Sequence, residues 1–438
     1  MKIGVVSLGC DKNRIDTENM LAYLEKDGFD FTPDPAQADV IVVNTCAFID
    51  EAKQEAIATI LEMAEYKKDK CRYLVVTGCL PQRYMNELKD GFPEVDAFLG
   101  TGSYHLLPRI IKDLDGKNTV CVPNDKDFRL HTRARVLTTP PHYAYLKIAE
   151  GCDNRCTYCA IPQIRGRYTS IPVEEVVKEA EELLAQYPIK EFIVVAQDVT
   201  RYGYDLEGRC MLVDLLDRLC KLDVEWIRLL YLYPEGISDE LLDFICKNDK
   251  ICKYLDIPCQ HISDRILKKM NRRITKQGIV SLFEKIRAKG DFCIRSTFIV
   301  GFPTETEEDV YELEDFLKFA KLDRCGFFKY SREDNTAAAR LDGQIDDEVK
   351  QKRYDRLYSL QERIMNDNTK RRIGSVEKVL YEGIDGEAEA FVGRTQYDAP
   401  DVDAKVWFGS SQCLEIGNFY PVKMIASEGC DLIGETQI

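Results

Sequence analysis

Short apolar runs alternate with stretches of helical periodicity along most of this chain. In residues 1–125, apolar runs near 3–7, 40–44 and 73–77 are each followed by a stretch typical of a helix. Strands joined by helical crossovers pair in parallel, so this alternation is typical of an α/β fold. We therefore expect a first domain at 1–125 that is built on a parallel sheet.

The same alternation continues through a second block, residues 140–367. Its apolar runs lie at 192–196, 226–230, 254–257, 292–300 and 325–329. This pattern predicts a βα barrel, full or partial, with its active site at the carboxyl ends of the strands. Short β-like runs separated by turn residues then occupy residues 371–438, and they predict a small antiparallel β-barrel.

Three cysteines lie in one short loop of the second block. They are Cys152, Cys156 and Cys159, with the spacing CxxxCxxC. Three thiolates can hold three irons of a cubane cluster and leave the fourth iron open to a small molecule. An all-cysteine electron-transfer cluster normally has four ligands, and a zinc site normally pairs CxxC with a second pair. The spacing therefore favours a cluster with one open iron over a structural zinc or unrelated core cysteines.

Cysteines also follow the first three predicted strands of the first block. They are Cys10, Cys46 and Cys79. Ligands of open α/β sheets bind outside the carboxyl ends of the strands, where these cysteines would gather. One such cysteine alone would more simply be a buried core residue. Three at matched positions predict a second cluster site.

Polar residues follow the predicted strands of the second block as well. Gln197 comes directly after one apolar run, His261 comes four residues after another, and residues 301–305 end a third. The simpler interpretation of His261 is a hydrogen-bonded structural histidine. For residues 301–306 it is a βα turn in which Thr304 or Thr306 caps the next helix.

Composition narrows the class of protein. The chain has 438 residues, 17 cysteines and a net charge of −15. No apolar segment is long enough to span a bilayer, and the N-terminus enters a strand without a signal peptide. We therefore expect a cytoplasmic protein with reduced cysteines and no membrane partner.

The third block is the most acidic part of the chain. Residues 371–438 hold six Lys or Arg and twelve Asp or Glu, a net charge of −6. A surface that binds RNA is usually basic, whereas an acidic surface complements a basic protein. We therefore expect a basic protein partner and no direct contact with tRNA.

The three blocks together resemble the methylthiotransferase family of radical S-adenosylmethionine (SAM) enzymes over essentially the whole chain. The opening motifs of the family are matched by Ser-Leu-Gly-Cys-Asp-Lys-Asn at 7–13, Val-Asn-Thr-Cys at 43–46 and Thr-Gly-Cys at 77–79. The RimO branch is matched by Gln-Asp-Val-Thr-Arg-Tyr-Gly at 197–203, Pro-Cys-Gln-His at 258–261 and the acidic segment 393–403. That branch modifies small-subunit ribosomal protein twelve, and the sister branch modifies an adenosine of tRNA.

The resemblance implies an enzyme that adds a methylthio group to the β-carbon of an aspartate in ribosomal protein twelve, either free or in the ribosome. It implies radical chemistry on an unactivated C–H bond, with an electron donor such as flavodoxin or ferredoxin. A tRNA adenosine methylthiotransferase is the alternative. A non-enzymatic iron–sulfur carrier is a third, but it would leave the strand-end motifs without a purpose.

The resemblance also implies roles for individual residues. It implies two 4Fe-4S clusters, one held by Cys152, Cys156 and Cys159 and an auxiliary one held by Cys10, Cys46 and Cys79. It implies contacts with SAM for Tyr158, Gln197, Gly301 and Glu305. The acidic segment of the third block, with Asp398, Asp401 and Asp403, is expected to dock the substrate. No catalytic residue is implied beyond the clusters.

Three positions depart from the family pattern. Asp11 stands where Pro is common, and Thr304 and Asn335 stand where Gly is common. Asn is the residue other than Gly that best tolerates a positive φ, so the turn at Asn335 is expected to persist. None of the three positions is a predicted cluster ligand.

Overall fold

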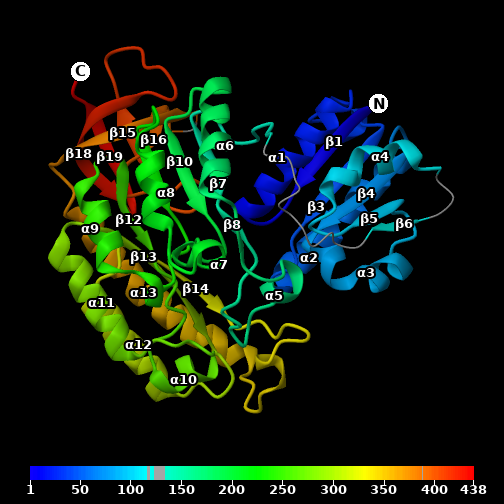
Figure 1. The fold of residues 1–438 in the computed structure, drawn as a ribbon. Coiled ribbons are helices and arrows are strands. Elements are labelled where there is room, and N and C mark those ends of the chain that lie inside the picture. Colours follow the sequence, from blue (N-terminus) through cyan, green and yellow to red (C-terminus); the bar gives the residue numbers. More distant parts are fainter. Residues whose placement is uncertain (116–118, 123–133, 387) are drawn as a thin grey trace. The chain divides into compact units, whose positions relative to one another are not determined.

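The computed structural model describes residues 1–115, 119–122, 134–386 and 388–438 (Figure 1). The chain forms two compact units. Unit 1 consists of Met1–Thr139, Tyr145–Leu183 and Ser331–Ala339; unit 2 consists of Pro140–Ala144, Leu184–Tyr330 and Arg340–Ile438. Two segments of the second predicted block thus belong to the same unit as the first block. The expected boundary at residue 125 lies outside the described residues.

Unit 1 contains a six-stranded sheet in the order β2-β1-β3-β4-β5-β6, with every pairing parallel. The strands are β1 (Lys2–Ser7), β2 (Asp30–Phe31), β3 (Val40–Thr45), β4 (Tyr73–Gly78), β5 (Ala97–Leu99) and β6 (Val120–Val122). The predicted parallel sheet is confirmed.

Helices cover both faces of this sheet. They are α1 (Asp11–Lys26), α2 (Asp50–Glu65), α3 (Cys79–Gly91) and α4 (Leu107–Asp113). Side chains alternate along β3, so Ile41 and Val43 pack against α2 and α3, whereas Val40 and Val42 pack against α1 and α4. Figure 1 shows the two pairs of helices on opposite sides of the sheet. Burial on both faces explains the uninterrupted apolar runs in the sequence.

The strands β1, β3 and β4 end at one edge of the sheet. Ser7 pairs with Asn44, and Asn44 pairs with Thr77. The chain enters α1 and α3 almost at once beyond this edge. The sequence pattern placed the first of these helices near Thr17, but it begins at Asp11, whose carboxylate suits the first helical turn.

The rest of unit 1 comes from the second block. It contains the C-terminal part of β7 (Tyr143–Lys147), β8 (Ala149–Glu150), α5 (Ile161–Ile164), β9 (Thr169–Ser170) and most of α6 (Val173–Gln186). β8 and β9 form a short antiparallel pair that flanks the loop with the CxxxCxxC spacing.

Unit 2 contains five strands that pair in parallel in the order β14-β13-β12-β11-β10. They are β10 (Glu191–Val195), β11 (Trp226–Leu229), β12 (Ile251–Asp256), β13 (Cys293–Val300) and β14 (Arg324–Lys329). The helices are α7 (Tyr204–Glu207), α8 (Leu212–Leu219), α9 (Asp239–Lys247), α10 (Asp264–Lys269), α11 (Lys276–Lys289), α12 (Glu307–Ala320) and α13 (Asp347–Lys370). This sheet is not a closed barrel, so the partial form of the predicted βα barrel is the correct one.

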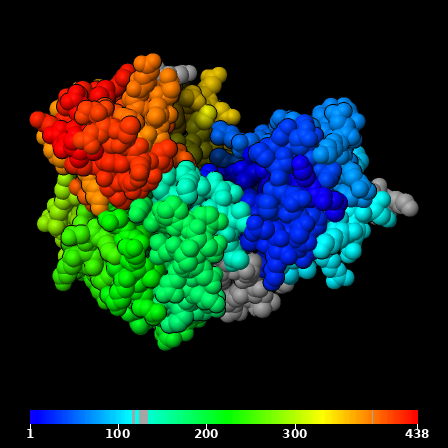
Figure 2. Space-filling view, turned by 90° about the horizontal axis from the view of Figure 1, so that it is seen from above, coloured from blue at the N-terminus to red at the C-terminus, as the bar shows by residue number. Residues whose placement is uncertain are grey.

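The C-terminal part of unit 2 is a closed five-stranded barrel in the order β15-β16-β17-β19-β18. Its strands are β15 (Val376–Asp385), β16 (Ala390–Arg394), β17 (Val406–Gly409), β18 (Phe419–Glu428) and β19 (Asp431–Thr436). The predicted barrel is confirmed, with one difference. β17 and β19 pair in parallel, because β18 lies on the far side of β19 and runs antiparallel to it before the chain returns. Figure 2 shows the barrel, orange to red, directly against green segments of the same unit.

In the part of the chain that the structure describes, every helix is too short or too polar to cross a bilayer.

Candidate iron–sulfur sites

The structure brings Cys10, Cys46 and Cys79 together at the strand edge of unit 1. Cys10 is exposed at the start of α1, Cys46 is half-buried just after β3, and Cys79 is buried as the first residue of α3. Gly9 allows the close approach of two of these loops. It has a φ of +88°, and a Cβ atom there would lie 3.1 Å from Cys46 Sγ.

The three thiols influence one another electrostatically. Burial raises the pKa of Cys46, and the nearby Cys10 raises it further. Burial also raises the pKa of Cys79 to about 12, with Cys46 and Cys10 acting in the same direction. The Arg165 guanidinium opposes this rise. Neighbouring thiolates need such cationic partners or a metal, because both kinds of group stabilise the deprotonated sulfur.

The CxxxCxxC loop forms the second group of thiols in unit 1. The Cys159 N–H donates to Cys156 O at 3.1 Å, and the Cys152 N–H donates to Gly166 O at 3.2 Å. Burial raises the pKa of Cys159, and Cys156 and Cys152 add to the rise. The Ile161 N–H, 3.4 Å from Cys159 Sγ, favours the thiolate. All three cysteines are half-buried residues.

Each of the two donor sets consists of three thiols. Within the described ranges, no three His, Cys, Asp or Glu side chains are already arranged around one point as ligands of a single ion. A 4Fe-4S cluster binds each cysteine through a different iron and does not need that convergence. Three thiols in each triad therefore match the number of ligands of a cubane cluster with one open iron.

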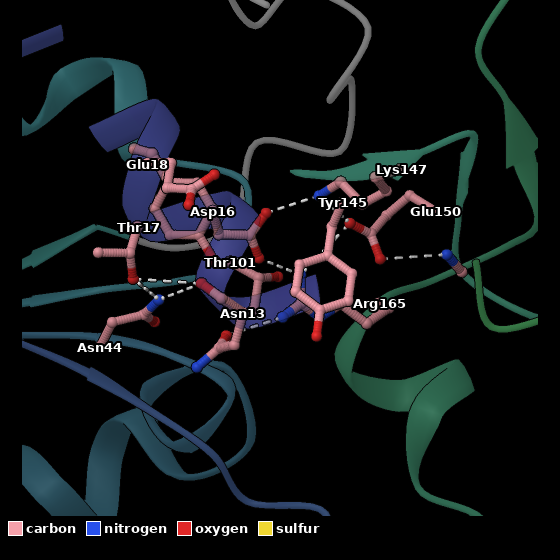
Figure 3. Close-up of polar contacts among 12 residues, drawn as sticks. Asn13, Asp16, Thr17, Glu18, Asn44, Thr101, Tyr145, Lys147, Glu150 and Arg165 are labelled. Atoms are coloured by element: carbon pink, nitrogen blue, oxygen red, sulfur yellow. Dashed lines mark hydrogen bonds and ion pairs between the residues drawn. The ribbon is translucent and has the colours of Figure 1, made fainter. Parts of the chain in front are cut away.

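A buried polar network lies beside the first triad, and sequence reasoning missed it (Figure 3). Asp16 on α1 accepts from Lys147 at 2.6 Å and from Arg165 at 2.5 Å. Glu150 accepts from the same two cations, at 2.9 Å and 3.3 Å. Each of the four side chains is less than a tenth exposed. Nothing in the sequence around Asp16 marks it as part of a site. A buried carboxylate needs a cationic partner, and only the fold shows which cations are near it.

Arg165 connects this network to the cysteines. Its Nη2 atom lies 3.0 Å from Asn13 Oδ1 and 3.5 Å from Cys79 Sγ. Asn13 in turn donates to Leu8 O at 2.7 Å and to Thr45 O at 3.1 Å. Asn13 belongs to the opening motif of the sequence, which was its only signal. The two side chains together contact Cys79 and the backbone of the chain that precedes the other two cysteines.

The segment Ser331–Ala339 also belongs to unit 1. Glu333, 1% exposed, pairs with Arg83 at 2.9 Å and with Lys53 at 3.1 Å. Asn335 has a φ of +60°, which confirms the expectation from the sequence, and its O accepts from Gln163. The Ala338 N–H donates to Thr157 O in the cysteine loop at 2.8 Å. This segment therefore fixes the backbone between two cysteines of the second triad.

The residues proposed for SAM lie in both units. Tyr158 is half-buried in the cysteine loop of unit 1. Gln197 follows β10 and Gly301 follows β13, both at strand carboxyl ends of unit 2. Glu305 is buried, and both of its oxygens accept from the Gly301 N–H, at 2.9 and 3.0 Å. Its carboxylate also pairs with Arg353 at 2.9 Å.

His261 completes the environment of this turn. Its Nδ1 accepts from the Ser263 N–H at 3.0 Å, and its Nε2 lies 3.3 Å from Glu305. The buried ring therefore makes the backbone hydrogen bond that its structural interpretation requires. Thr306 caps α12 in a capping box with Asp309, so the predicted cap is also confirmed.

The structure gives a packing reason for glycine at position 301. Gly301 has a φ of +74°, and a Cβ atom there would lie 2.3 Å from Lys350 Cγ on α13. Packing against this helix already requires a glycine.

The structure contradicts two of the three residues expected to dock the substrate. Asp398 is 1% exposed and pairs with Arg324 of β14 at 2.6 Å. The side chain of Asp403 is 2% exposed and accepts from the Tyr254 hydroxyl of β12 at 2.6 Å. These carboxylates join the barrel to the sheet of unit 2, so a partner cannot reach them. Asp401 is exposed, and its carboxylate accepts from the Tyr143 hydroxyl at 3.4 Å.

Unit 2 also has a cavity of about 1180 Å³ at the opposite edge of its sheet. Trp226, Cys293 and Arg324, at the starts of β11, β13 and β14, line one side, and Arg372 and Tyr397 of the C-terminal part line the other. The strands are parallel, so this cavity is remote from the carboxyl ends that carry Gln197 and Gly301.

Family patterns match successive parts of the chain. The uncharacterized protein family UPF0004 matches residues 2–100. The radical SAM superfamily matches residues 146–317. The TRAM domain matches residues 373–436.

Curated relatives match the whole chain. A ribosomal protein uS12 methylthiotransferase RimO from Caldicellulosiruptor saccharolyticus is 47% identical over 440 residues, which cover 99% of both chains. A protein of the same name from Clostridium botulinum is 48% identical over 438 residues, 99% of this chain and 97% of the relative.

Solved structures share the fold at low identity. The radical SAM methyltransferase TsrM from Kitasatospora setae, with cobalamin and a 4Fe-4S cluster bound, superposes with a TM-score of 0.56 at 16% identity. The match covers 77% of this chain and 76% of that one. The similarity extends to the arrangement of strands and helices and shows the fold alone.

Proposed function

Because the chain belongs to the family of ribosomal protein uS12 methylthiotransferases named RimO, we propose that it adds a methylthio group to the β-carbon of an aspartate in uS12. The chain is a radical SAM methylthiotransferase. The observation that carries the finer proposal is the identity of 47–48% along the full length, together with the two triads of thiols.

Each triad holds one 4Fe-4S cluster in this proposal. Cys152, Cys156 and Cys159 hold the cluster that binds SAM, and Cys10, Cys46 and Cys79 hold the auxiliary cluster. When bound, the two clusters and SAM supply radical chemistry, a sulfur atom and a methyl group. A low-potential carrier such as flavodoxin or ferredoxin supplies the electron.

Side chains and backbone groups of the protein hold the cysteine ligands in position. The N–H of Ile161 favours the thiolate of Cys159, and Arg165 favours that of Cys79. The segment Ser331–Ala339 holds the backbone of the cysteine loop at Thr157. Such supporting contacts orient the ligands of a metal site and adjust its redox properties.

The contacts with SAM remain a proposal for Tyr158, Gln197, Gly301 and Glu305. For Glu305 we propose an indirect role, because its carboxylate is already used by Gly301 and Arg353. It is a positioning residue that fixes the turn after β13. Gly301 contributes the backbone of that turn.

The partner is a basic ribosomal protein, and tRNA is not a direct partner in this proposal. The net charge of −6 in residues 371–438 supports it. Asp401 is the remaining docking candidate, because Asp398 and Asp403 are buried in ion pairs. Modification of a ribosomal protein also suggests that the enzyme acts in the cytoplasm.

The mass of uS12 tests the substrate. We expect uS12 from cells with the gene to carry one methylthio group on an aspartate, and uS12 from cells without it to lack the group. A copy with Cys79→Ala should not restore the modification. Loss of a methylthio group from tRNA nucleosides, with uS12 unchanged, would instead support the tRNA alternative.

Iron content tests the two cluster sites. Replacing Cys152, Cys156 and Cys159 with Ala should leave half the iron and abolish SAM cleavage. Replacing Cys10, Cys46 and Cys79 should also leave half the iron but retain SAM cleavage. A control with Ala at three other half-buried cysteines, Cys220, Cys246 and Cys430, should retain all the iron. Full iron in the second triple variant would disprove the auxiliary site.

A further inference from the structure

We propose that Arg165 is a positioning residue for the auxiliary cluster. Its guanidinium donates a hydrogen bond to the sulfur of Cys79, a ligand of that cluster, and thereby raises the reduction potential of the cluster. This inference rests on the proposed function, because it takes Cys79 as a cluster ligand. Its basis is the arrangement of buried side chains around the guanidinium (Figure 3).

The orientation of the guanidinium is determined by three neighbours besides the sulfur. Nη1 donates to Asp16 at 2.5 Å and to Glu150 at 3.3 Å, and Nη2 donates to Asn13 Oδ1 at 3.0 Å. The remaining contact of Nη2 is with Cys79 Sγ at 3.5 Å. The planar fork of arginine can make these contacts in one geometry, which a lysine cannot reproduce.

The charges around Arg165 are already balanced without the cysteine. Asp16 and Glu150 carry two negative charges, and Lys147 and Arg165 carry two positive charges. These four side chains already neutralise one another, so the network needs no further charged partner for stability. The contact with Cys79 is therefore additional to charge balance, and it places a cationic N–H donor on a sulfur that the protein buries.

Arg165 and Asn13 together organise all three cysteines. Arg165 contacts Cys79 directly and contacts Asn13. Asn13 holds the carbonyl of Leu8, two residues before Cys10, and the carbonyl of Thr45, one residue before Cys46. Arg165 also lies only six residues beyond Cys159. One side chain therefore links the segment of one triad to the ligands of the other.

A hydrogen bond to a ligand sulfur should favour the reduced cluster, which carries one more negative charge. Hydrogen bonds to sulfur are among the factors that determine the potentials of iron–sulfur clusters. Loss of a supporting contact also typically weakens metal binding by about 10- to 100-fold. We therefore expect both a lower reduction potential and weaker iron retention without Arg165.

The test uses the full chain with Ala at Cys152, Cys156 and Cys159, so that only the auxiliary cluster gives a signal. In this background we compare Arg165, Arg165→Gln and Arg165→Lys. The readouts are the midpoint potential, from a redox titration followed by electron paramagnetic resonance, and the iron retained against a chelator. We expect Gln to lower the potential and to weaken retention by about 10- to 100-fold. Lys, which keeps the charge without the fork, should have a smaller effect.

Arg135 provides a matched control in the same unit. It is 4% exposed and pairs with Glu18 and with Glu179, the latter at 2.8 Å, and it donates to Tyr145 O at 2.9 Å. Arg135→Gln should destabilise the chain and leave the potential unchanged. If Arg165→Gln behaves in the same way, Arg165 is only structural and the inference is wrong.

Two other outcomes are also decisive. If the background chain with Arg165 intact holds no iron, the auxiliary site itself is wrong, which is a failure of the proposed function. If Arg165→Gln does not fold, Arg165→Lys gives the answer, and a potential equal to that of the background chain overturns the inference.

Discussion

The guanidinium of Arg324 on β14 donates a hydrogen bond to the carboxylate of Asp398 at 2.6 Å, and both side chains are buried. Asp398 follows β16 of the barrel, so this pair joins the barrel to the parallel sheet of unit 2. Asp403 makes the same kind of junction with Tyr254. Part of the acidic character of the barrel therefore serves the fold rather than a partner.

Removing the charge of Asp398 should destabilise unit 2. Asp398→Asn leaves the Arg324 guanidinium buried without its counter-charge, which typically costs about 3–5 kcal/mol. The midpoint of thermal unfolding measures the loss. Asp401→Asn is the control, because Asp401 is exposed and Asn tolerates its φ of +67°. Its effect should stay within about 0.5 kcal/mol. Equal effects of the two changes would show that the buried pair contributes nothing.

The same carboxylate predicts a dependence of stability on pH. Burial by itself raises the pKa of Asp398, but Arg372 and Arg324 lower it below its ordinary value. A pKa lowered by folding gives stability that is complete above the unfolded value, about 3.9, and is lost as the pH falls through the folded value. Acidification below about pH 4 should therefore destabilise the wild type more than Asp398→Asn. Unfolding in urea at several pH values measures the difference, and parallel curves would contradict it.

The ionisation of Asp403 should affect the pH dependence of stability in the opposite direction. Burial raises its pKa, and Arg295 and Arg324 only partly offset this effect. A carboxyl whose pKa is raised by folding destabilises the folded state while it is ionised. The free energy of unfolding therefore rises as the pH falls through the folded pKa, because the folded state favours the neutral form. Asp403→Asn should therefore cost less than Asp398→Asn at neutral pH. The same urea series measures this order, and a larger loss for Asp403→Asn would refute it.

A double-mutant cycle should separate two requirements at Gly301. Gly301→Ala places a Cβ against Lys350 and also forces a positive φ on alanine. The backbone effect alone costs about 1–2 kcal/mol. Lys350→Ala removes the Cγ atom at 2.3 Å but keeps the Cβ atom at 3.1 Å, so in this background the substitution should cost less than in the wild type. The free energy of unfolding of the four chains gives the coupling. Additive effects would mean that the helix yields to the new methyl group.

Glu305 should matter through the turn that it holds. Glu305→Gln leaves only one acceptor oxygen for the Gly301 N–H and removes a charge from the buried side of Arg353, which should cost about 1–3 kcal/mol. Glu307→Gln is the matched control, because Glu307 also pairs with Arg353 but is about half exposed. It should cost no more than about 1 kcal/mol. A larger loss for the control would contradict the role given to Glu305.

Asn335 should tolerate glycine and no β-branched residue. Its φ of +60° lies in the left-handed region. Asn335→Gly should be nearly neutral, whereas Asn335→Val should cost about 1–2 kcal/mol. Thermal unfolding compares the two variants. Because Asn335 accepts through its backbone O, neither substitution removes a side-chain hydrogen bond that would confuse the result.

The sequence by itself determined the fold class and the positions of the two cysteine triads. Apolar runs that alternate with helical periods require parallel sheets, because only helical crossovers can return the chain to the same edge. The cysteines at the ends of β1, β3 and β4 followed from that rule. The barrel strands were also evident from short apolar runs, although the parallel pair of β17 and β19 was not. The order of strands in the barrel depends on which strand edges pair in the folded structure, and the sequence of one strand does not show this.

Only the tertiary structure decided the roles of the charged residues. The sequence of the barrel shows that Asp398 and Asp403 are acidic, but not that Arg324 and Tyr254 face them from strands about 75 and 150 residues earlier. The same is true of Asp16, Lys147 and Arg165, which meet from three separate segments. The spacing of apolar residues in the sequence shows which face of one helix or strand is buried. It does not report which distant element supplies the partner, and for a buried charge that partner determines its function.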